Sequence, residues 1–81
     1  NLYINQEKKC ALTGVSINLE NKGKNNTASL DRIDSSKGYT LDNIQWIHKI
    51  VQKIKWDLSE LELIKWCQKI VSHKDGTRDY E

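Results

Sequence analysis

The sequence predicts a small α+β domain in which a β-hairpin is followed by two helices and preceded by the end of another helix. Three observations carry this prediction. Residues 15–19 alternate apolar and polar side chains, which is the period of a half-buried strand, and residues 28–33 supply a returning strand. Residues 43–55 place their apolar side chains on one half of a helical wheel. Ser59 and Glu62 form the S-x-x-E pattern of a helix start.

In chain order, residues 2–9 read as a helix end, with lysines suited to a C-terminus. The Asn-, Lys- and Gly-rich residues 21–27 read as the hairpin loop. Asp42 or Asn43 is the expected cap of the helix over residues 43–55. A second helix is expected over residues 59–73.

The 81 residues form one domain with a thin core. We expect an ordered part over about residues 2–73 and a frayed tail over residues 74–81. The chain does not begin with methionine, and its first residues resemble the end of a helix, so we expect a fragment of a longer protein.

Composition says more about the cellular compartment of this protein than about its function. No apolar run approaches the roughly 18–20 residues of a membrane span. The two cysteines come without a signal peptide or a disulfide framework, so we expect an intracellular, cytoplasmic protein. The net charge of +2 is too small to indicate a nucleic-acid partner by itself. Residues 43–56, however, contain lysines and no acid, which suits either a phosphate-binding face or an ordinary solvated helix face.

Three motifs carry a family resemblance. They are C-x-L-[ST]-G at residues 10–14, S-L-D-R-I-D-S-S-K-G-Y at residues 29–39 and D-N-I-Q-W-I-H-K at residues 42–49. Together they resemble the HNH endonucleases, also called ββα-metal or His-Me finger nucleases. The similarity is to the phage and mobile-element type in which Asp-Arg replaces the usual Asp-His. It covers roughly residues 6–73.

The resemblance implies cleavage of DNA phosphodiester bonds with Mg²⁺ or Mn²⁺. By position, Asp31 and Gln52 match the metal ligands, Asn43 matches the asparagine that holds the loop in register, and Arg32 stands where most members have the water-activating histidine. Carboxylate and amide oxygens are the hard ligands that such an ion prefers. Cleavage of both strands would imply a homodimer or sequential nicking.

Two departures from the family pattern bear on activity. Arg32 stays protonated and cannot act as the base, so it is expected to bind the scissile phosphate. Water activation is then open to His48, to Tyr39, to hydroxide or to a segment outside this chain. Gln52 is one methylene longer than the asparagine of the pattern, which can displace the metal. A catalytically weakened or inactive HNH-fold nucleic-acid-binding module is therefore the alternative function, and a protein-interaction domain is a third.

Two further sets of residues complete the expected sites. The DNA backbone contacts are expected from exposed lysines, namely Lys22, Lys24, Lys49, Lys53 and Lys55. Many HNH domains also carry a structural zinc, and four residues of suitable type are present: Cys10, His48, Cys67 and His73. Their spacing matches no tight zinc pattern, and the preferred interpretation is that both cysteines are buried thiols.

Overall fold

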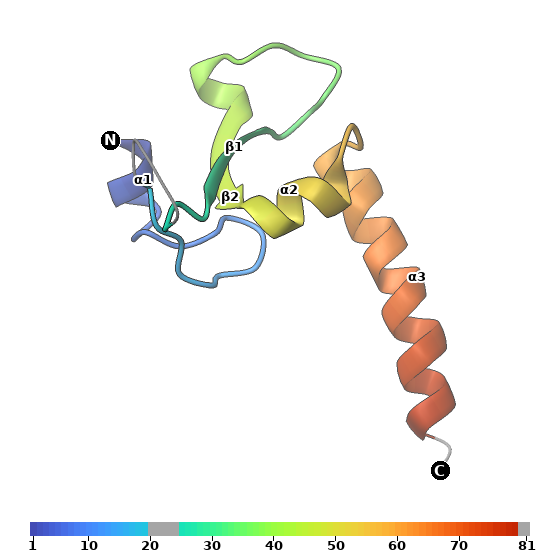
Figure 1. The fold of residues 1–81 in the computed structure, drawn as a ribbon. Coiled ribbons are helices and arrows are strands. Elements are labelled where there is room, and N and C mark those ends of the chain that lie inside the picture. The colour runs from blue at the N-terminus through green and yellow to red at the C-terminus, as the bar shows by residue number, and fades with distance from the viewer. Residues whose placement is uncertain (20–24, 80–81) are drawn as a thin grey trace.

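The computed structural model describes residues 1–19 and 25–79 and has α+β architecture. The elements follow in the order α1 (Leu2–Asn5), β1 (Ala28–Arg32), the 3-10 helix η1 (Leu41–Asn43), β2 (Ile44–His48), α2 (Lys49–Lys55) and α3 (Glu60–Asp79). β1 and β2 form a two-stranded antiparallel sheet, α2 follows it directly, and α3 leads away from it (Figure 1). A hairpin followed by helices is thus confirmed as the general architecture.

The predicted pairing of residues 15–19 with residues 28–33 is wrong. Residues 15–19 form one isolated bridge, between Ser16 and Lys9, and no strand. Their alternation does not mark a buried face, because Ile17 is in the core whereas Val15 is 49% exposed. The loop predicted at residues 21–27 lies mostly outside the described residues. The first helix is also shorter than predicted, since α1 ends at residue 5.

The partner of β1 is β2, which lies in a segment predicted to be helical. The register runs from Ala28 opposite His48 to Arg32 opposite Ile44. The prediction of a helix over residues 43–55 is therefore wrong for its first half and confirmed for α2. Isoleucine and tryptophan side chains suit a strand as well as an amphipathic helix, so periodicity alone does not separate the two. Pairing with β1 buries Ile47 completely, at 0% exposure.

The beginning of α3 is set by the predicted capping box. Ser59 N–H donates to Glu62 Oε1 over 3.0 Å, and Glu62 N–H donates to Ser59 Oγ over 3.2 Å. The helix continues through Asp79, past its predicted end at residue 73, and residues 80–81 lie outside the description. Fraying of residues 74–81 stays a prediction. None of the helices among residues 1–19 and 25–79 has the length and apolar character that a membrane crossing requires.

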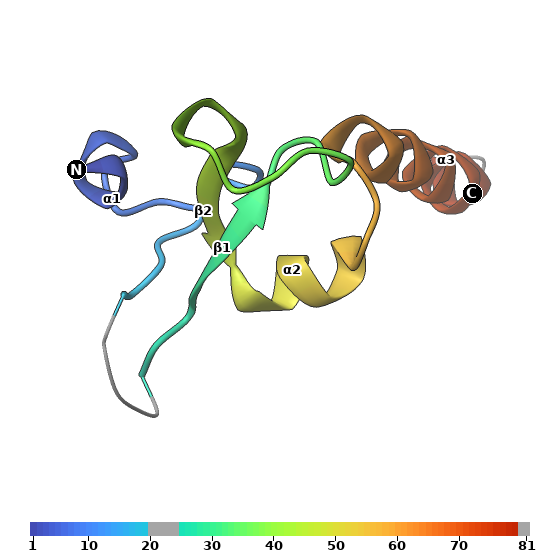
Figure 2. The same cartoon turned by 90° about the horizontal axis from the view of Figure 1, so that it is seen from above.

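The core is small and lies around the sheet. Cys10, Ile17, Ala28 and Ile47 form it, and Trp46 is one of the half-buried side chains packed against it. Part of the loop between β1 and β2 lies beside the start of α3 (Figure 2). Two hydrogen bonds hold it there: Glu60 N–H donates to the Ile33 carbonyl over 3.0 Å, and Ser35 Oγ donates to the Asp57 carbonyl over 2.8 Å. Strands, loop and both helices therefore meet at the end of β1.

Candidate functional site

Asp31 lies at the centre of this meeting point and is 3% exposed. Its register partner on β2 is Gln45, whose Nε2 donates to Asp31 Oδ2 over 3.1 Å. At the end of α2, Lys55 is 1% exposed, and its ammonium donates to Asp31 Oδ1 over 2.6 Å. The same ammonium donates to the carbonyl of Arg32. One buried carboxylate is thus held by both the second strand and the helix.

The polar network extends to α3. Gln45 Nε2 donates to Glu60 Oε1 over 2.9 Å in addition to its bond with Asp31. The amide of Gln45 therefore bridges two carboxylates from distant parts of the chain. Such a network favours one arrangement of the chain, because each buried polar group needs its hydrogen-bond partner in place.

Asn43 holds the loop that joins the strands. It is 6% exposed, and its Oδ1 accepts from Asp34 N–H over 2.9 Å. Its Nδ2 donates to the Asp34 carbonyl over 3.0 Å and to the Gly38 carbonyl over 2.8 Å. These backbone bonds are those of a residue that braces a loop. A catalytic contribution of Asn43 stays a prediction.

Arg32, the last residue of β1, contacts Tyr39 of the following loop. The guanidinium carbon of Arg32 lies 5.1 Å from the centroid of the Tyr39 ring, and Arg32 Nη1 donates to the Lys37 carbonyl over 3.2 Å. Tyr39 is 63% exposed. The other N–H groups of the Arg32 guanidinium can donate hydrogen bonds to an incoming anion.

Asp34, in the same loop, caps a turn rather than facing Asp31. It accepts from Ser36 Oγ over 2.6 Å and from Ser36 N–H over 3.0 Å. These hydrogen bonds, that from the hydroxyl first, lower the pKa of the Asp34 carboxyl below its ordinary value.

Two observations bear on whether the expected ligands fit a hard divalent cation. The side-chain oxygen Oε1 of Gln52 is buried and has no hydrogen-bond partner among the described residues, as a ligand oxygen awaiting a cation would. Asp31 already binds a cationic group, the Lys55 ammonium. Oxygen donors of these types suit such an ion, and Lys55 would compete with it for the Asp31 carboxylate. A metal site shared by Asp31 and Gln52 stays a prediction.

His48 lies apart from Asp31. It pairs with Ala28, three positions along the ladder from the Asp31–Gln45 pair, which is roughly 10 Å. As the N-cap of α2, its Nδ1 accepts from Ile50 N–H over 3.1 Å. In neutral imidazole the other nitrogen then carries the proton. His48 Nδ1 is thus engaged in capping α2, and a catalytic role of His48 stays a prediction.

The four candidate zinc ligands are not gathered into one site. Cys10 is buried in the core, Cys67 is exposed on α3, and both are free thiols. The interpretation of two buried thiols is thus confirmed for Cys10 and wrong for Cys67. Burial raises the pKa of the Cys10 thiol, but hydrogen bonds with Thr13 and nearby backbone groups outweigh it and lower the pKa. Over residues 1–19 and 25–79, no group of three or more His, Cys, Asp or Glu is placed to hold a metal ion.

The expected DNA-contacting lysines fall into three groups. Lys49 and Lys53 are exposed on α2. Lys55 is buried against Asp31, so its expected phosphate contact is corrected to an internal ion pair. Lys22 and Lys24 lie outside the described residues.

Sequence reasoning expected Asp31 to face polar residues that include Gln45 and Lys55, but it missed Glu60 and the strand that carries Gln45. Gln45 bonds to Asp31, and Glu60 bonds to Gln45, only because residues 44–48 form a strand. Lys55 lies three residues after Gln52 on the same side of a helix, but its neighbours along the chain do not show that it pairs with Asp31.

Comparisons of the chain with protein-family models, with curated proteins and with solved structures find no match. The family resemblance therefore stays a prediction from the sequence motifs.

Proposed function

We propose that this chain is a divalent-metal-dependent DNA endonuclease of the HNH type, which hydrolyses phosphodiester bonds. The position of Asp31 supports this most. Its carboxylate is buried where β1, β2 and α2 meet, directly before Arg32 and beside the loop that Asn43 holds. The motif resemblance implies a hairpin followed by a helix, with Asp31 leaving the second strand and Asn43 opening the helix. Here Asp31 lies in the first strand and Asn43 precedes the second, so the support is limited to the order Asp-Arg, loop asparagine, helix.

Asp31 and Gln52 would hold Mg²⁺ or Mn²⁺. Such an ion, when bound, stabilises the departing 3′ oxygen and the charge that grows on the phosphate. Lys55 has to release the Asp31 carboxylate for this. Arg32 would bind the scissile phosphate through the guanidinium N–H groups that the Lys37 carbonyl does not occupy.

Water activation is assigned to Tyr39 rather than to His48. The Tyr39 ring lies against the phosphate-binding guanidinium, whereas His48 lies at the far end of the hairpin with Nδ1 engaged in capping. We expect Tyr39→Phe to slow nicking by roughly 100-fold or more, the usual contribution of a general base. His48→Asn is the matched comparison, because asparagine retains the capping acceptor, and it should leave the rate nearly unchanged.

The experiment that tests the function is nicking of supercoiled plasmid with Mg²⁺ or Mn²⁺. Activity should vanish with EDTA and in Asp31→Asn. It should persist in Asp57→Asn, an equal charge change at an exposed position. Circular dichroism of each variant verifies that the fold is retained. Cleavage by folded Asp31→Asn, or cleavage that survives EDTA, would refute the proposal.

The Asp31–Lys55 ion pair favours a second candidate, a DNA-binding module that no longer cuts. In that case the carboxylate is a structural group, and DNA affinity does not depend on the cation. Binding of a labelled duplex across a salt series separates the two candidates. Lys49→Ala and Lys53→Ala should each reduce the salt dependence of log K by about 1. EDTA-insensitive binding without nicking by the folded chain would select the binding module.

A further inference from the structure

Glu60 is the first residue of α3, and the beginning of α3 is held at the end of β1. Glu60 N–H donates to the carbonyl of Ile33, two residues after Asp31, over 3.0 Å. The Ser59 carbonyl accepts from the N–H of Leu63 over 3.0 Å, and the Leu63 side chain is 6% exposed. The first turn of α3 therefore has a defined position relative to the candidate site.

The Glu60 carboxylate contacts the amide of Gln45. Its Oε1 accepts from Gln45 Nε2 over 2.9 Å, and Glu60 is half-buried. Over residues 1–19 and 25–79, no lysine or arginine forms an ion pair with it. A glutamate in the first turn of a helix is favourable wherever its side chain points, because of the helix dipole. The contact with a strand residue 15 positions earlier therefore needs a separate explanation.

The amide nitrogen of Gln45 is fully used by two carboxylates. A side-chain amide has two N–H protons, and Gln45 Nε2 donates to Asp31 Oδ2 over 3.1 Å as well as to Glu60. The other oxygen of Asp31, Oδ1, accepts from the Lys55 ammonium. Lys55 and Gln45 thus hold the two oxygens of Asp31, and Glu60 holds Gln45. Without Glu60, the Gln45 side chain is free to rotate, and Asp31 Oδ2 loses a fixed donor.

We propose that Glu60 is a positioning residue, which acts through Gln45 to fix the orientation of the Asp31 carboxylate. Its effect on cleavage rests on the proposed function, in which Asp31 is a metal ligand. Hydrogen-bond partners of metal-ligating groups contribute roughly 10- to 100-fold to metal affinity or activity. The first turn of α3 is then part of the site, although it lies far from Asp31 in the sequence.

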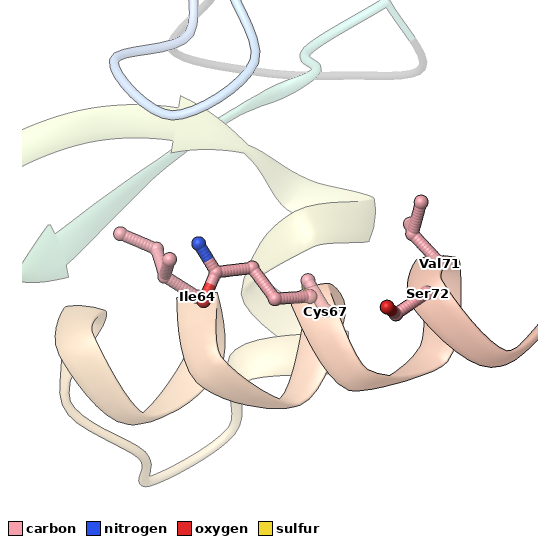
Figure 3. A pocket seen from close by; sticks show the side chains of 5 residues that line it. Ile64, Cys67, Val71 and Ser72 are labelled. Carbon is pink, nitrogen blue, oxygen red and sulfur yellow. The ribbon is translucent and has the colours of Figure 1, made fainter.

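The rest of α3 supplies a reference for this network. Beyond its first turn the helix runs away from the sheet (Figure 1). An apolar groove lies on this part of the helix, lined by Ile64, Cys67, Gln68, Val71 and Ser72 (Figure 3). Gln68 is exposed. It is therefore a glutamine of the same chain whose amide is open to water.

NMR spectroscopy of the wild-type chain tests the arrangement without any substitution. Both protons on Gln45 Nε2 should resonate downfield of those of Gln68, because each of them donates to a carboxylate. Gln45 amide protons that resonate where those of the exposed Gln68 do would overturn the proposal.

Glu60→Ala and Glu62→Ala separate positioning from a structural role at the start of α3. Both remove a carboxylate from the first turn, but Glu62 accepts from Ser59 N–H in the capping box. In Glu60→Ala the carbon-13 resonance of the Asp31 carboxyl should shift, whereas in Glu62→Ala it should keep its wild-type position. Glu60→Gln retains an oxygen that can accept from Gln45 and should bring the resonance back toward the wild-type value. An unchanged Asp31 resonance in folded Glu60→Ala, or an equal shift in Glu62→Ala, would overturn the proposal.

Nicking kinetics then measure the contribution to cleavage. Glu60→Ala should lower kcat by about 10-fold or more and leave the KM for DNA unchanged, because a carboxylate engaged with Gln45 does not bind the phosphate backbone. Glu60→Gln should recover most of the rate, and Glu62→Ala should keep the wild-type kcat. A wild-type kcat in Glu60→Ala would overturn the role in cleavage. A wild-type chain that does not nick DNA refutes the proposed function alone, and the NMR measurements still decide whether Glu60 positions Asp31.

Discussion

The hairpin–helix unit of residues 28–55 and the helix α3 bury opposite kinds of side chain. At the centre of the hairpin–helix unit lies an ion pair, with Asp31 at 3% and Lys55 at 1% exposure. α3 is the longest element, with 20 residues. Among its described side chains, Leu63 is the one buried apolar group, whereas larger apolar side chains such as that of Trp66 are exposed to solvent. Polar partners, more than apolar area, thus determine how this small domain is held together around its site.

The two regions should also differ in how substitutions affect their stability. Replacing a buried ion pair by apolar groups can be neutral or stabilising, whereas removing one partner leaves an uncompensated charge. The unit of residues 28–55 should therefore be sensitive to single changes in its polar groups. The exposed part of α3 should tolerate substitution in the monomer.

The largest expected effect comes from Lys55→Met. Asp31 would stay buried with its charge unpaired, which lowers the free energy of unfolding by about 3–5 kcal/mol. Urea unfolding followed by circular dichroism measures it, with Lys53→Met as the exposed control on the same helix. The double variant Asp31→Asn, Lys55→Met should recover part of the loss, since no lone charge remains. Equal stabilities of the two lysine variants would show that the ion pair does not hold the unit together.

A smaller effect is expected from Asn43→Ala. The change leaves Asp34 N–H and two carbonyls without their partner and should cost about 2–3 kcal/mol. Asn43→Asp sharpens the result, because aspartate keeps the acceptor for Asp34 N–H and loses the two donated bonds. At neutral pH its stability should be no higher than that of Asn43→Ala, because a buried carboxylate oxygen then faces the carbonyls of Asp34 and Gly38. An alanine variant as stable as the wild type would mean that the loop is held by other contacts.

The smallest effect is the acid dependence of stability. The pKa of Asp34 is lowered by Ser36, and that of Asp42 by the Thr40 hydroxyl, both in the loop between the strands. The backbone N–H and the hydroxyl of Ser59 lower the pKa of Glu62 at the start of α3. A carboxyl with a lowered pKa in the folded state stabilises it above its unfolded pKa, about 4, and loses this contribution as the pH falls through the folded pKa.

Urea midpoints measured at pH 6, 4 and 3 should therefore fall below about pH 4. Removing the loop carboxyls with Asp34→Asn and Asp42→Asn should flatten this fall more than Glu62→Gln does, since two of the three groups lie in the loop. A midpoint that does not decrease between pH 4 and pH 3 would contradict the assignment.

Local signals in the sequence predicted the parts of this molecule that depend on neighbours along the chain. The capping box at Ser59 begins α3, and the strand expected over residues 28–33 appears as β1. Such signals act over one helical turn or one short run, because caps and side-chain periods involve residues only a few positions apart. They also placed Asp31 and Arg32 at the end of a strand and Asn43 before the next element.

Tertiary structure decided the rest. Residues 44–48 suit a helix or a strand, and only pairing with β1 makes them β2, with Gln45 opposite Asp31. The neighbours of Lys55 along the chain predict that it is exposed to solvent, but the carboxylate with which it pairs stands 24 residues earlier. Whether a charge is solvated or paired depends on what folding brings within about 3 Å of it, and the few residues on either side do not contain that information.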